Sequence, residues 1–422
     1  MEKMNQETVH DDPETWPPLN GVAALMRRCY NGENLIPLGQ ALLARALENP
    51  SDAYAYLDFS TVLQLIGNRE NGLAIQMEAI KLQALYSLSA QGATPGLRLL
   101  VVMGPGDFMA NTPVELLVED SDVSLQLLYL LPDADWPTTI PDHDVMMVAV
   151  GESDESQSLL QQLTFYMTDW PRPVINYPEG ISRLSRDRVC AIFQGLSGIE
   201  MPLSVRLSRA DLQALASGEK AIFSVLPDGG FPIIIRPIGS HAGTNLEKMM
   251  TVEDIAAYLQ RVPDQGFYIS RFVDYRSRDG LFRKYRVVLI EGVPFICHFA
   301  VSEHWVIHYA NAGMSDSAAK RVEEAHCMET FDSDFAVRHG PALKTIYEHI
   351  GLSYFGIDCA ETQSGELLLF EIDNSMVVHA LDPEDIFPYK KPAMRKVFTA
   401  FRKMLENAAQ AGISDETSQK NS

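Results

Sequence analysis

The sequence predicts a chain of mixed fold class, in which a small all-α region is followed by an α/β unit and then by an α+β unit. Apolar residues recur at helical spacing between about residues 20 and 92. From residue 97 to about 180, short apolar runs alternate with segments that suit helices or turns, which is typical of a parallel sheet covered on both faces. Beyond about residue 220, strand-like runs dominate, as expected for antiparallel hairpins.

The composition is that of a folded globular chain, and it excludes several classes of partner. With 422 residues, of which 46% are hydrophobic and 21% charged, the chain is long enough for about two to four domains. The formal net charge of −22 and the lack of a long basic run argue against nucleic acid or an anionic membrane, since both need clustered positive charge. A site for an anion must therefore gather its few basic residues locally.

Cysteine usage and hydropathy predict a cytoplasmic location. The five cysteines are scattered and none forms a CxxC pair, which fits reduced thiols better than disulfides or a zinc site. The N-terminus is polar and acidic and lacks the apolar core of a signal peptide. No stretch approaches the roughly 18 apolar residues that span a bilayer, so we expect no membrane partner.

Residues 19–95 are predicted to form the helical region, after a disordered tail over 1–18. One helix carries leucines at a spacing of three to four, and the second and third helices are expected over 52–66 and 70–88. The segment 61–83 resembles a single tetratricopeptide-type helix pair. Because no second copy follows, a helical cap packed on the rest of the chain or on another subunit is favoured over a peptide-binding solenoid.

The α/β unit is expected to contain buried strands in the runs 97–103, 123–131 and 143–151. In the α+β unit, the strand-like runs include 220–226 and 304–310. A terminal amphipathic helix is expected over about 392–409, followed by a polar tail over 411–422.

The most informative chemistry lies in a predicted hairpin near the C-terminus. Asp358 precedes a Ser364-Gly365 turn, and Glu371 and Asp373 follow on the next strand, where they share one face because side chains alternate. Three carboxylates on one surface repel one another unless a cation neutralises them, and oxygen ligands of this kind suit Mg²⁺. The structural alternative is a solvent-facing acidic stripe, but the apolar surroundings favour a function.

Gly356-Ile357-Asp358 and Glu371-Ile372-Asp373-Asn374 resemble the metal-binding end of the ATP-grasp ligases, a group that includes the glutamate ligases of ribosomal proteins, the glutathione synthetases and the D-alanine–D-alanine ligases. The resemblance implies ATP and Mg²⁺ as cofactors, with Asp358, Glu371 and Asp373 as metal ligands. Asp373 stands where the family usually has asparagine, so either Asp373 or Asn374 supplies the third ligand.

The segment 231–249 resembles the strand and flexible glycine loop with which this family covers the ATP phosphates. Small residues let backbone amides approach phosphate oxygens, and a cation at the strand end neutralises charge. Arg236 stands in place of the usual lysine. The loop residues that the resemblance implies are Gly239, Ser240, Ala242 and Gly243.

The segment ISRFVD resembles the family's hinge strand, which implies that Phe272 and Val273 lie beside adenine and that Asp274 holds the ribose. Lys284 and Arg286 share a strand face. By resemblance, Arg286 reaches the triphosphate or an acyl phosphate.

Three weaker assignments complete the predicted site. Arg188 lies in a segment that resembles the one carrying the family's first ATP-contacting lysine. His308 and Asn311 fall where related ligases place groups near the acyl phosphate, although packing or surface roles are the alternative for the histidines. His379 follows the acidic hairpin in a loop that often touches substrate.

The resemblance covers about residues 98–408. It implies an ATP-grasp fold with a pre-grasp α/β domain over 96–184, a lid over 185–268 and a nucleotide- and metal-binding part over 269–410. The implied activity is an ATP-dependent carboxylate–amine ligase that forms an acyl phosphate, which an amine captures. Small molecules, amino acids or a peptide are the expected substrates, and a homodimer is one open assembly. A small-molecule kinase, a non-catalytic scaffold and a thiol nucleophile in place of the amine stay open as alternatives.

Overall fold

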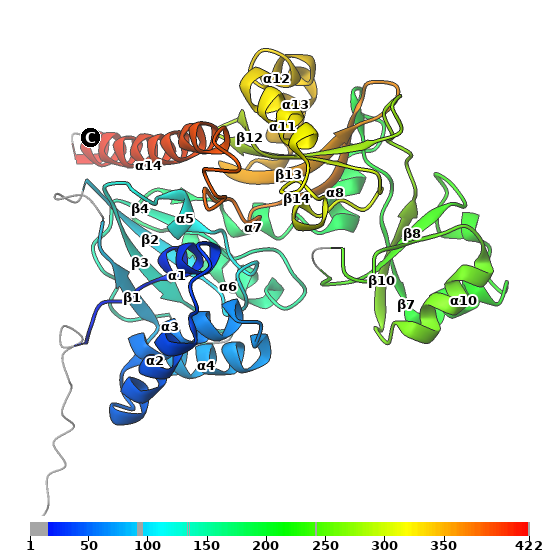
Figure 1. The fold of residues 1–422 in the computed structure, drawn as a ribbon. Coiled ribbons are helices and arrows are strands. Elements are labelled where there is room, and N and C mark those ends of the chain that lie inside the picture. Colours follow the sequence, from blue (N-terminus) through cyan, green and yellow to red (C-terminus); the bar gives the residue numbers. More distant parts are fainter. Residues whose placement is uncertain (1–15, 91–95, 133, 135, 241–242, 421–422) are drawn as a thin grey trace, which may run out of the picture.

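The structure is a computed structural model that describes residues 16–90, 96–132, 134, 136–240 and 243–420. Most of the predicted tail over 1–18, and Ala242 of the predicted glycine loop, lie outside these residues. The described chain is organised around three sheets, with the N-terminal helices beneath the first sheet and the second sheet set apart from the other two (Figure 1).

The N-terminal region is a group of helices packed on the first sheet. Asp52 caps the third helix by accepting a hydrogen bond from the Ala55 amide. These helices are α1 (Val22–Tyr30), α2 (Ile36–Glu48), α3 (Ala53–Leu65) and α4 (Arg69–Leu82).

The helix predicted over 70–88 corresponds to α4, and the prediction that it continues to residue 88 is wrong. Helix α4 ends at Leu82, and β1 (Leu85–Leu88) instead pairs antiparallel with β3 at the edge of the first sheet. The reason lies in Tyr86, whose ring is fully buried beside Tyr54 and Tyr129 and whose hydroxyl donates to the Ala79 carbonyl. The extended backbone of β1 directs the Tyr86 ring into the core, which explains why the helix ends before this residue.

The first sheet has the strand order β1-β3-β2-β4-β5, and every neighbouring pair except β1–β3 is parallel. The chain passes from β2 to β3 on one side and then to β4 on the other, so the strand order reverses beyond the carboxyl ends of β2 and β4. Such a reversal leaves a crevice in which ligands commonly bind. The elements are β2 (Leu97–Met103), α5 (Val114–Leu117), β3 (Val123–Tyr129), β4 (Val145–Val148), α6 (Gln157–Met167), β5 (Val174–Ile175) and α7 (Pro178–Ile181).

The second sheet is antiparallel, with the order β7-β10-β8-β9, and its apolar face is covered by α9 and α10. The run 220–226, predicted as a strand, is instead the short 3₁₀ helix η2 (Ile222–Ser224), in which the Ser224 hydroxyl donates to the Ala221 carbonyl. The elements are β7 (Val205–Ser208), α9 (Arg209–Ala216), β8 (Ile233–Pro237), β9 (Glu247–Met249), α10 (Val252–Arg261) and β10 (Gly266–Arg271).

The third sheet has the order β12-β11-β13-β14-β6 and is antiparallel except for β6, which runs parallel to β14. Helices α11 to α13 cover one of its faces (Figure 1). The elements are α8 (Arg186–Phe193), β6 (Ile199–Glu200), β11 (Phe282–Ile290), β12 (Val293–Ser302), α11 (Ala318–Thr330), α12 (Phe335–Arg338), α13 (Gly340–Ile350), β13 (Tyr354–Glu361) and β14 (Leu367–Asp373).

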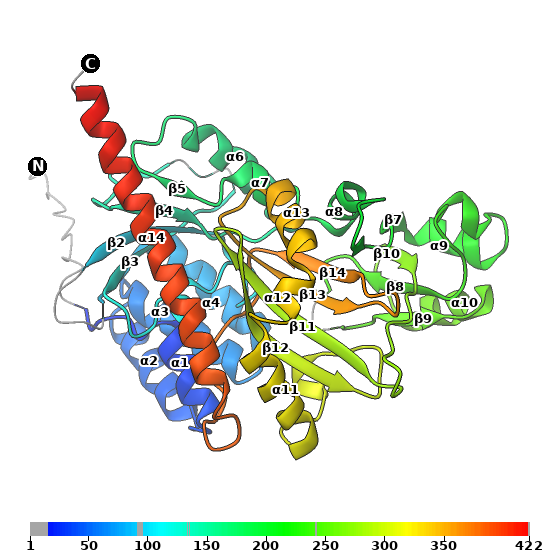
Figure 2. The same ribbon diagram turned by 90° about the horizontal axis from the view of Figure 1, so that it is seen from above.

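The long helix α14 (Lys390–Lys420) joins the first and third sheets. Its residues Val397 and Phe401 belong to one buried cluster with Val145 of β4 and Val288 of β11, and the helix lies across both sheets in Figure 2. The polar tail predicted from residue 411 begins within this helix. No helix in the described part of the chain is long and apolar enough to cross a membrane.

Candidate active site

The third sheet builds the site by alternation of its side chains. On β11, Tyr285 and Val287 point toward α11 to α13, so Lys284 and Arg286 point to the opposite face. On β13 the same alternation turns Asp358 to the face of Lys284 and Arg286, and the strand register places Arg286 directly opposite Asp358.

Asp358 is held by two cations. Its two oxygens accept hydrogen bonds from Nε and Nη2 of Arg286 at 2.8 and 3.0 Å, and Lys284 Nζ lies 2.6 Å from Oδ2. Burial alone would raise the pKa of this carboxyl, but Arg286 and Lys284 outweigh that effect and hold its pKa well below the usual range. Asp358 is therefore a buried anion whose charge the protein itself neutralises.

A β-bulge places Glu371 beside Asp358. Asp358 pairs with Glu371 but the next residue, Cys359, pairs with Leu369, so Phe370 is the extra residue of β14. Arg186, at the start of α8, donates to the Phe370 carbonyl at 2.7 Å and forms an ion pair with Glu371. Burial opposes ionisation of Glu371, but Arg186 and Arg236 prevail and lower its pKa.

Arg236 reaches the same site from β8. Ile233 and Ile235 are buried in the core of the second sheet, so Arg236 points out of it, opposite Tyr268 of β10. Its guanidinium donates to the Ser240 hydroxyl at 3.2 Å and to the Ser240 carbonyl. Burial, with a contribution from Arg186, lowers the pKa of Arg236 to about 10. A buried guanidinium beside a second cation lies where a bound anion is stabilised.

These cations line one part of a cavity of about 290 Å³, here called the smaller cavity. Aromatic and apolar side chains line its remaining wall. The rings of Phe272 and Trp305 meet edge to face with centroids 5.3 Å apart, and Lys248 Nζ lies 4.3 Å from the Phe272 centroid. Lys284 also donates to the Ile307 carbonyl at 3.3 Å, which ties the charged part to the apolar part.

A second cavity of about 520 Å³, here called the larger cavity, lies at the reversal of strand order in the first sheet. Its walls come from the loop after β2 (104–111), the loop after β4 (149–156), Gly239 and Ser240 after β8, and the end of β14. The two cavities share four lining residues, which are Met109, Arg186, Tyr268 and Glu371.

The larger cavity is dominated by carboxylates. Arg206 is paired with Asp154 through Nη2 at 2.7 Å, whereas Glu152 is bound by the Gln157 side-chain amide at 2.9 Å. Burial raises the pKa of Glu152 to about 7. The acidic side chains that line this cavity are Asp107, Glu152, Asp154, Glu155, Glu371 and Asp373.

The three carboxylates predicted to bind Mg²⁺ together, Asp358, Glu371 and Asp373, are not arranged as one group of ligands. Within the described residues, no group of three or more His, Cys, Asp or Glu side chains is arranged to hold a metal ion. Asp358 does not fit such a role, because Arg286 and Lys284 bind both its oxygens. Glu371 and Asp373 do fit Mg²⁺ in donor chemistry and both line the larger cavity.

The structure also separates the roles of Asp373 and Asn374. One oxygen of Asp373 accepts hydrogen bonds from the Ser375 amide at 2.7 Å and hydroxyl at 2.8 Å, at the edge of the larger cavity. The Asn374 side chain points the other way and donates to the Val150 carbonyl at 3.0 Å. Asn374 therefore ties the third sheet to the first, and Asp373 is the residue turned toward the cavity.

Most of the predicted site residues line one of the two cavities. The smaller cavity is lined by Arg236, Gly243, Phe272, Val273, Lys284, Arg286, His308, Asp358 and Glu371. The larger cavity is lined by Gly239, Ser240, Glu371 and Asp373. Burial, together with Lys284, lowers the pKa of His308.

Four predicted residues line neither cavity. His379 is buried, and its ring centroid lies 5.2 Å from that of Tyr30 and 5.6 Å from that of His298. Arg188 is exposed and donates to the Ser182 carbonyl at 2.6 Å. Asp274 is paired with Arg276 at 3.0 Å, and the Asn311 side chain accepts a hydrogen bond from the His308 amide at 3.1 Å, capping η3 (Tyr309–Asn311). The run 304–310, predicted as a strand, is this 3₁₀ turn and the loop before it, whose apolar side chains pack around the smaller cavity.

Arg186, two residues before Arg188, is the arginine of this segment that lines the cavities. On α8, Val189, Cys190 and Phe193 are buried, and Arg186 lies at helical spacing from them, so the same spacing in the sequence could have identified it. Sequence reasoning also missed Glu152, Tyr268 and Met109. Glu152 and Met109 come from loops that only the strand order of the first sheet brings together.

Neither a family model nor a curated protein matches the sequence. Among solved structures, the chain is similar to a RimK domain ATP-grasp protein from Sphaerobacter thermophilus, with 14% identity, a TM-score of 0.43, and coverage of 74% of this chain and 99% of that one. It is also similar to the VanG D-Ala:D-Ser ligase from Enterococcus faecalis, with 14% identity, a TM-score of 0.45, and coverage of 73% of this chain and 99% of that one. The third is D-alanyl-alanine synthetase A from Vibrio cholerae, at 11% identity, a TM-score of 0.45 and coverage of 75% and 99%. The function of this chain has to be argued from its own two cavities.

Proposed function

We propose that this chain is an ATP-dependent ligase that joins a carboxylate to an amine, with release of ADP and phosphate. The observation that carries the proposal is the pairing of two unlike cavities at shared residues. The smaller is aromatic and cationic, the larger is acidic, and Arg186 and Glu371 line both. A reaction that brings a nucleotide and a cationic substrate to one point needs this arrangement.

The smaller cavity suits a nucleoside triphosphate. Phe272 and Trp305 offer an apolar, aromatic surface for the base. Arg186, Arg236 and Lys284 reach the other part from three different elements, and such cations neutralise phosphate oxygens. Although the chain has a net charge of −22, the cations that line this cavity outnumber its two carboxylates, Asp358 and Glu371.

The larger cavity suits the amine. An ammonium group is attracted by the carboxylates of its wall, and Glu152, with a pKa raised to about 7 by burial, is matched to accept a proton from it near neutral pH. The substrates are small molecules such as amino acids.

The reaction takes place where the cavities meet. A carboxylate oxygen of the substrate attacks the γ-phosphorus, and the bond to the β–γ bridging oxygen breaks, so that ADP leaves with the electron pair. Arg186 and Arg236 stabilise the charge that develops on the transferred group. Glu152 takes one proton from the ammonium group, and the resulting amine nitrogen attacks the acyl carbon. Phosphate then leaves with the electrons of the broken C–O bond and takes the second nitrogen proton, so that the amide forms.

Glu371 and Asp373 are the residues proposed to hold Mg²⁺, which when bound supplies further neutralisation of the phosphates. Asp358 has a different role in this proposal, because it orients Lys284 and Arg286 toward the nucleotide. Gly239 and Ser240, which follow β8, line the larger cavity, and Gly243 lines the smaller one. Closure of the second sheet over the site would exclude water, which otherwise hydrolyses an acyl phosphate.

A reducing, cytoplasmic setting is part of the proposal. The cysteines Cys29, Cys190, Cys297, Cys327 and Cys359 are all free thiols. Free thiols are the state that proteins keep in reducing compartments.

The test measures ADP release by the full chain with Mg²⁺, ATP and a mixture of the proteinogenic amino acids. Hydroxylamine is added in parallel, because it captures an acyl phosphate as a hydroxamate that iron(III) detects. We expect ADP release that depends on the amino acids, together with hydroxamate. ADP release that yields a phosphorylated hydroxyl compound and no hydroxamate would identify a kinase instead, and absence of ATP binding by calorimetry would identify a scaffold.

A further inference from the structure

The loop after β2, residues 104–111, forms a wall of the site. Gly104, Gly106 and Asp107 line the larger cavity, and Met109 lines both cavities. A displacement of this loop would therefore change the shape of the place where the two cavities meet.

The loop is tightly built. The Asn111 side chain exchanges two hydrogen bonds of 2.8 Å with the amide and carbonyl of Gly104, and the Asp107 carboxylate accepts one from the Met109 amide at 3.0 Å. Gly106 has φ of +147°, and a Cβ placed there would lie 2.4 Å from the Ala110 Cβ. These contacts join the two ends of the loop and leave no room for a side chain at Gly106.

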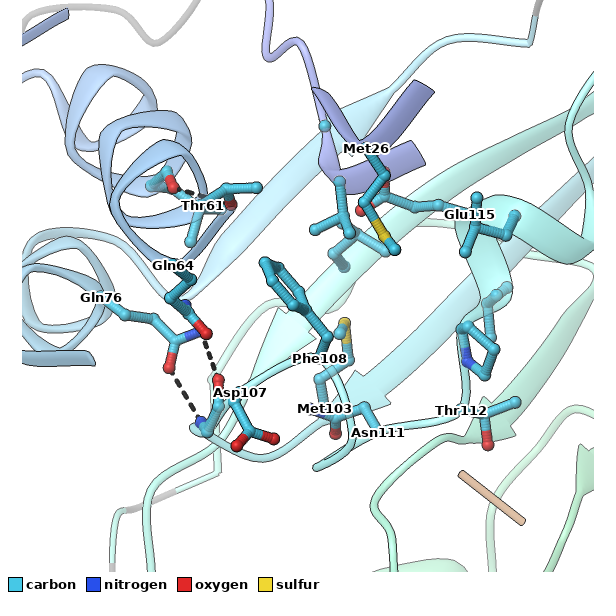
Figure 3. Close-up of a pocket in the computed structure, with 18 of the residues that line it drawn as sticks. Met26, Thr61, Gln64, Gln76, Met103, Asp107, Phe108, Asn111, Thr112 and Glu115 are labelled. Carbon is cyan, nitrogen blue, oxygen red and sulfur yellow. Dashed lines mark hydrogen bonds between the residues drawn. The ribbon is translucent and has the colours of Figure 1, made fainter. Parts of the chain in front are cut away.

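Helix α4 of the N-terminal region holds this unit from behind. Gln76 is buried, and its side-chain amide donates to the Gly106 carbonyl at 2.9 Å while its oxygen accepts from the Gly106 amide at 2.8 Å (Figure 3). Arg69, the first residue of α4, forms an ion pair with Asp107, with Nη2 2.8 Å from Oδ2. Both contacts join the helical region directly to residues that line the larger cavity.

The space behind the loop is not fully packed. A cavity of about 70 Å³ lies beside these contacts, between the loop and the N-terminal helices, and the labelled side chains Met26, Gln64 and Phe108 lie around it in Figure 3. The buried Oε1 atom of Gln64 has no hydrogen-bond partner among the described residues. The hydrogen bonds of Gln76 and the ion pair of Arg69 hold the loop on this side, and its far end is held by the hydrogen bond from the Gly151 amide to the Ala110 carbonyl at 2.8 Å.

We propose that the N-terminal helices are a working part of the substrate site, in which Gln76 and Arg69 act as positioning residues that fix the wall formed by Gly106, Asp107 and Met109. This proposal rests on the proposed ligase function for the identity of the substrates. It gives the helical region a role in substrate affinity that packing on the sheet alone would not give it.

The first measurement is hydrogen–deuterium exchange of the full chain, which reports on the loop without any substrate. Gln76→Leu removes both hydrogen bonds to Gly106 at similar volume, and Arg69→Ala removes the ion pair. We expect faster exchange in the peptide covering 104–111 in both variants and unchanged exchange in 231–249. Arg69→Lys keeps the charge and should restore protection. The matched controls are Gln40→Leu, on the exposed side of α2, and Arg28→Ala, whose partner is Glu33.

The second measurement is the concentration of the amino acid mixture that half-saturates ADP release. We expect it to rise about tenfold in Gln76→Leu and severalfold in Arg69→Ala, with half-saturating ATP changed less than twofold. Gln76→Glu, which keeps the acceptor for the Gly106 amide, serves if Gln76→Leu does not fold. Unchanged exchange in 104–111, or faster exchange without any change in substrate half-saturation, would overturn the proposal. If the unsubstituted protein showed no turnover, the proposed ligase function would be wrong. The exchange experiment would still show whether the helices hold the loop.

Discussion

The two cavities of this molecule are neighbours with opposite electrostatics. The smaller is lined by Arg186, Arg236, Lys284 and Arg286 beside aromatic rings, whereas the charged residues of the larger are six carboxylates and three arginines. Most of the cations project from strand faces, where alternation fixes them, whereas most of the carboxylates come from loops at the ends of strands. The difference shows that the position of a residue in the fold sorts these charges between the two cavities, and the proposed function assigns to each cavity a ligand of opposite charge.

Removing the shared cation should have the largest effect on this arrangement. Arg186→Ala takes a charge from the point where the cavities meet and leaves Glu371 without its ion-pair partner. We expect turnover to fall by about 10²- to 10³-fold, as for the loss of one transition-state donor. The measurement is steady-state ADP release. Arg188→Ala is the control two residues away, and it should retain full activity because Arg188 is exposed; equal losses in both variants would contradict the assignment.

Glu152→Gln removes the carboxyl of the larger cavity whose pKa burial raises to about 7. We expect turnover near pH 8 to fall about a hundredfold, the usual contribution of a proton acceptor. The parent rate should rise as pH passes about 7, where Glu152 loses its proton, and the variant should lack this rise. A pH–rate profile that is the same in both proteins would remove Glu152 from the proton transfer.

Glu152→Gln should also change how the stability of the folded protein depends on pH. Because burial raises the pKa of Glu152 in the folded state, ionisation is harder there than in the unfolded chain. Stability is therefore lost as pH rises from the ordinary glutamate range, about 4.3, to about 7. Thermal melts at pH 5 and pH 8 should show that Glu152→Gln loses less stability over this interval than the parent.

Substitutions of two neighbouring carboxylates, Glu371 and Asp358, test which of them binds Mg²⁺. Glu371→Gln should raise the Mg²⁺ concentration that half-saturates turnover by about tenfold, because it removes a proposed ligand. Asp358→Asn should leave that Mg²⁺ concentration unchanged and weaken ATP binding, since Lys284 and Arg286 lose their counter-ion. Titration of Mg²⁺ at saturating ATP separates the two outcomes, and a larger Mg²⁺ requirement in Asp358→Asn would make it a metal ligand after all.

The smallest expected effect comes from the aromatic wall of the smaller cavity. Trp305→Ala should weaken ATP binding about tenfold, the range of a single base–aromatic contact, and leave half-saturation by amino acids unchanged. Calorimetry with ATP provides the measurement. If Trp305→Ala instead altered the amino acid dependence, the base would not lie on this wall.

The parts of the site that the sequence could predict are those set by strand alternation. Lys284 and Arg286 share a face, as do Glu371 and Asp373, and a period of two in a strand is enough to place them. Long apolar runs such as 97–103 and 123–131 likewise predicted strands β2 and β3.

The features of the site that could not be predicted from the sequence depend on contacts between distant segments. The bulge at Phe370 arises from pairing between β13 and β14, and no local signal marks it. Glu152 and the loop 104–111 meet only because the strand order places β2 beside β4. The run 304–310 is as apolar as a strand, but its side chains surround a cavity instead of pairing in a sheet, and composition alone cannot distinguish these two uses.

The way in which the second sheet is attached has a consequence for protein engineering. Val205 at the start of β7 pairs with Ile269 near the end of β10, so the chain enters and leaves this sheet at adjacent points. Insertions with neighbouring ends are the ones that a host fold tolerates best. The segment 205–271 could therefore be cut out and replaced by a short linker, or exchanged for the corresponding piece of another protein, while the two remaining sheets and the helix α14 that joins them stay intact.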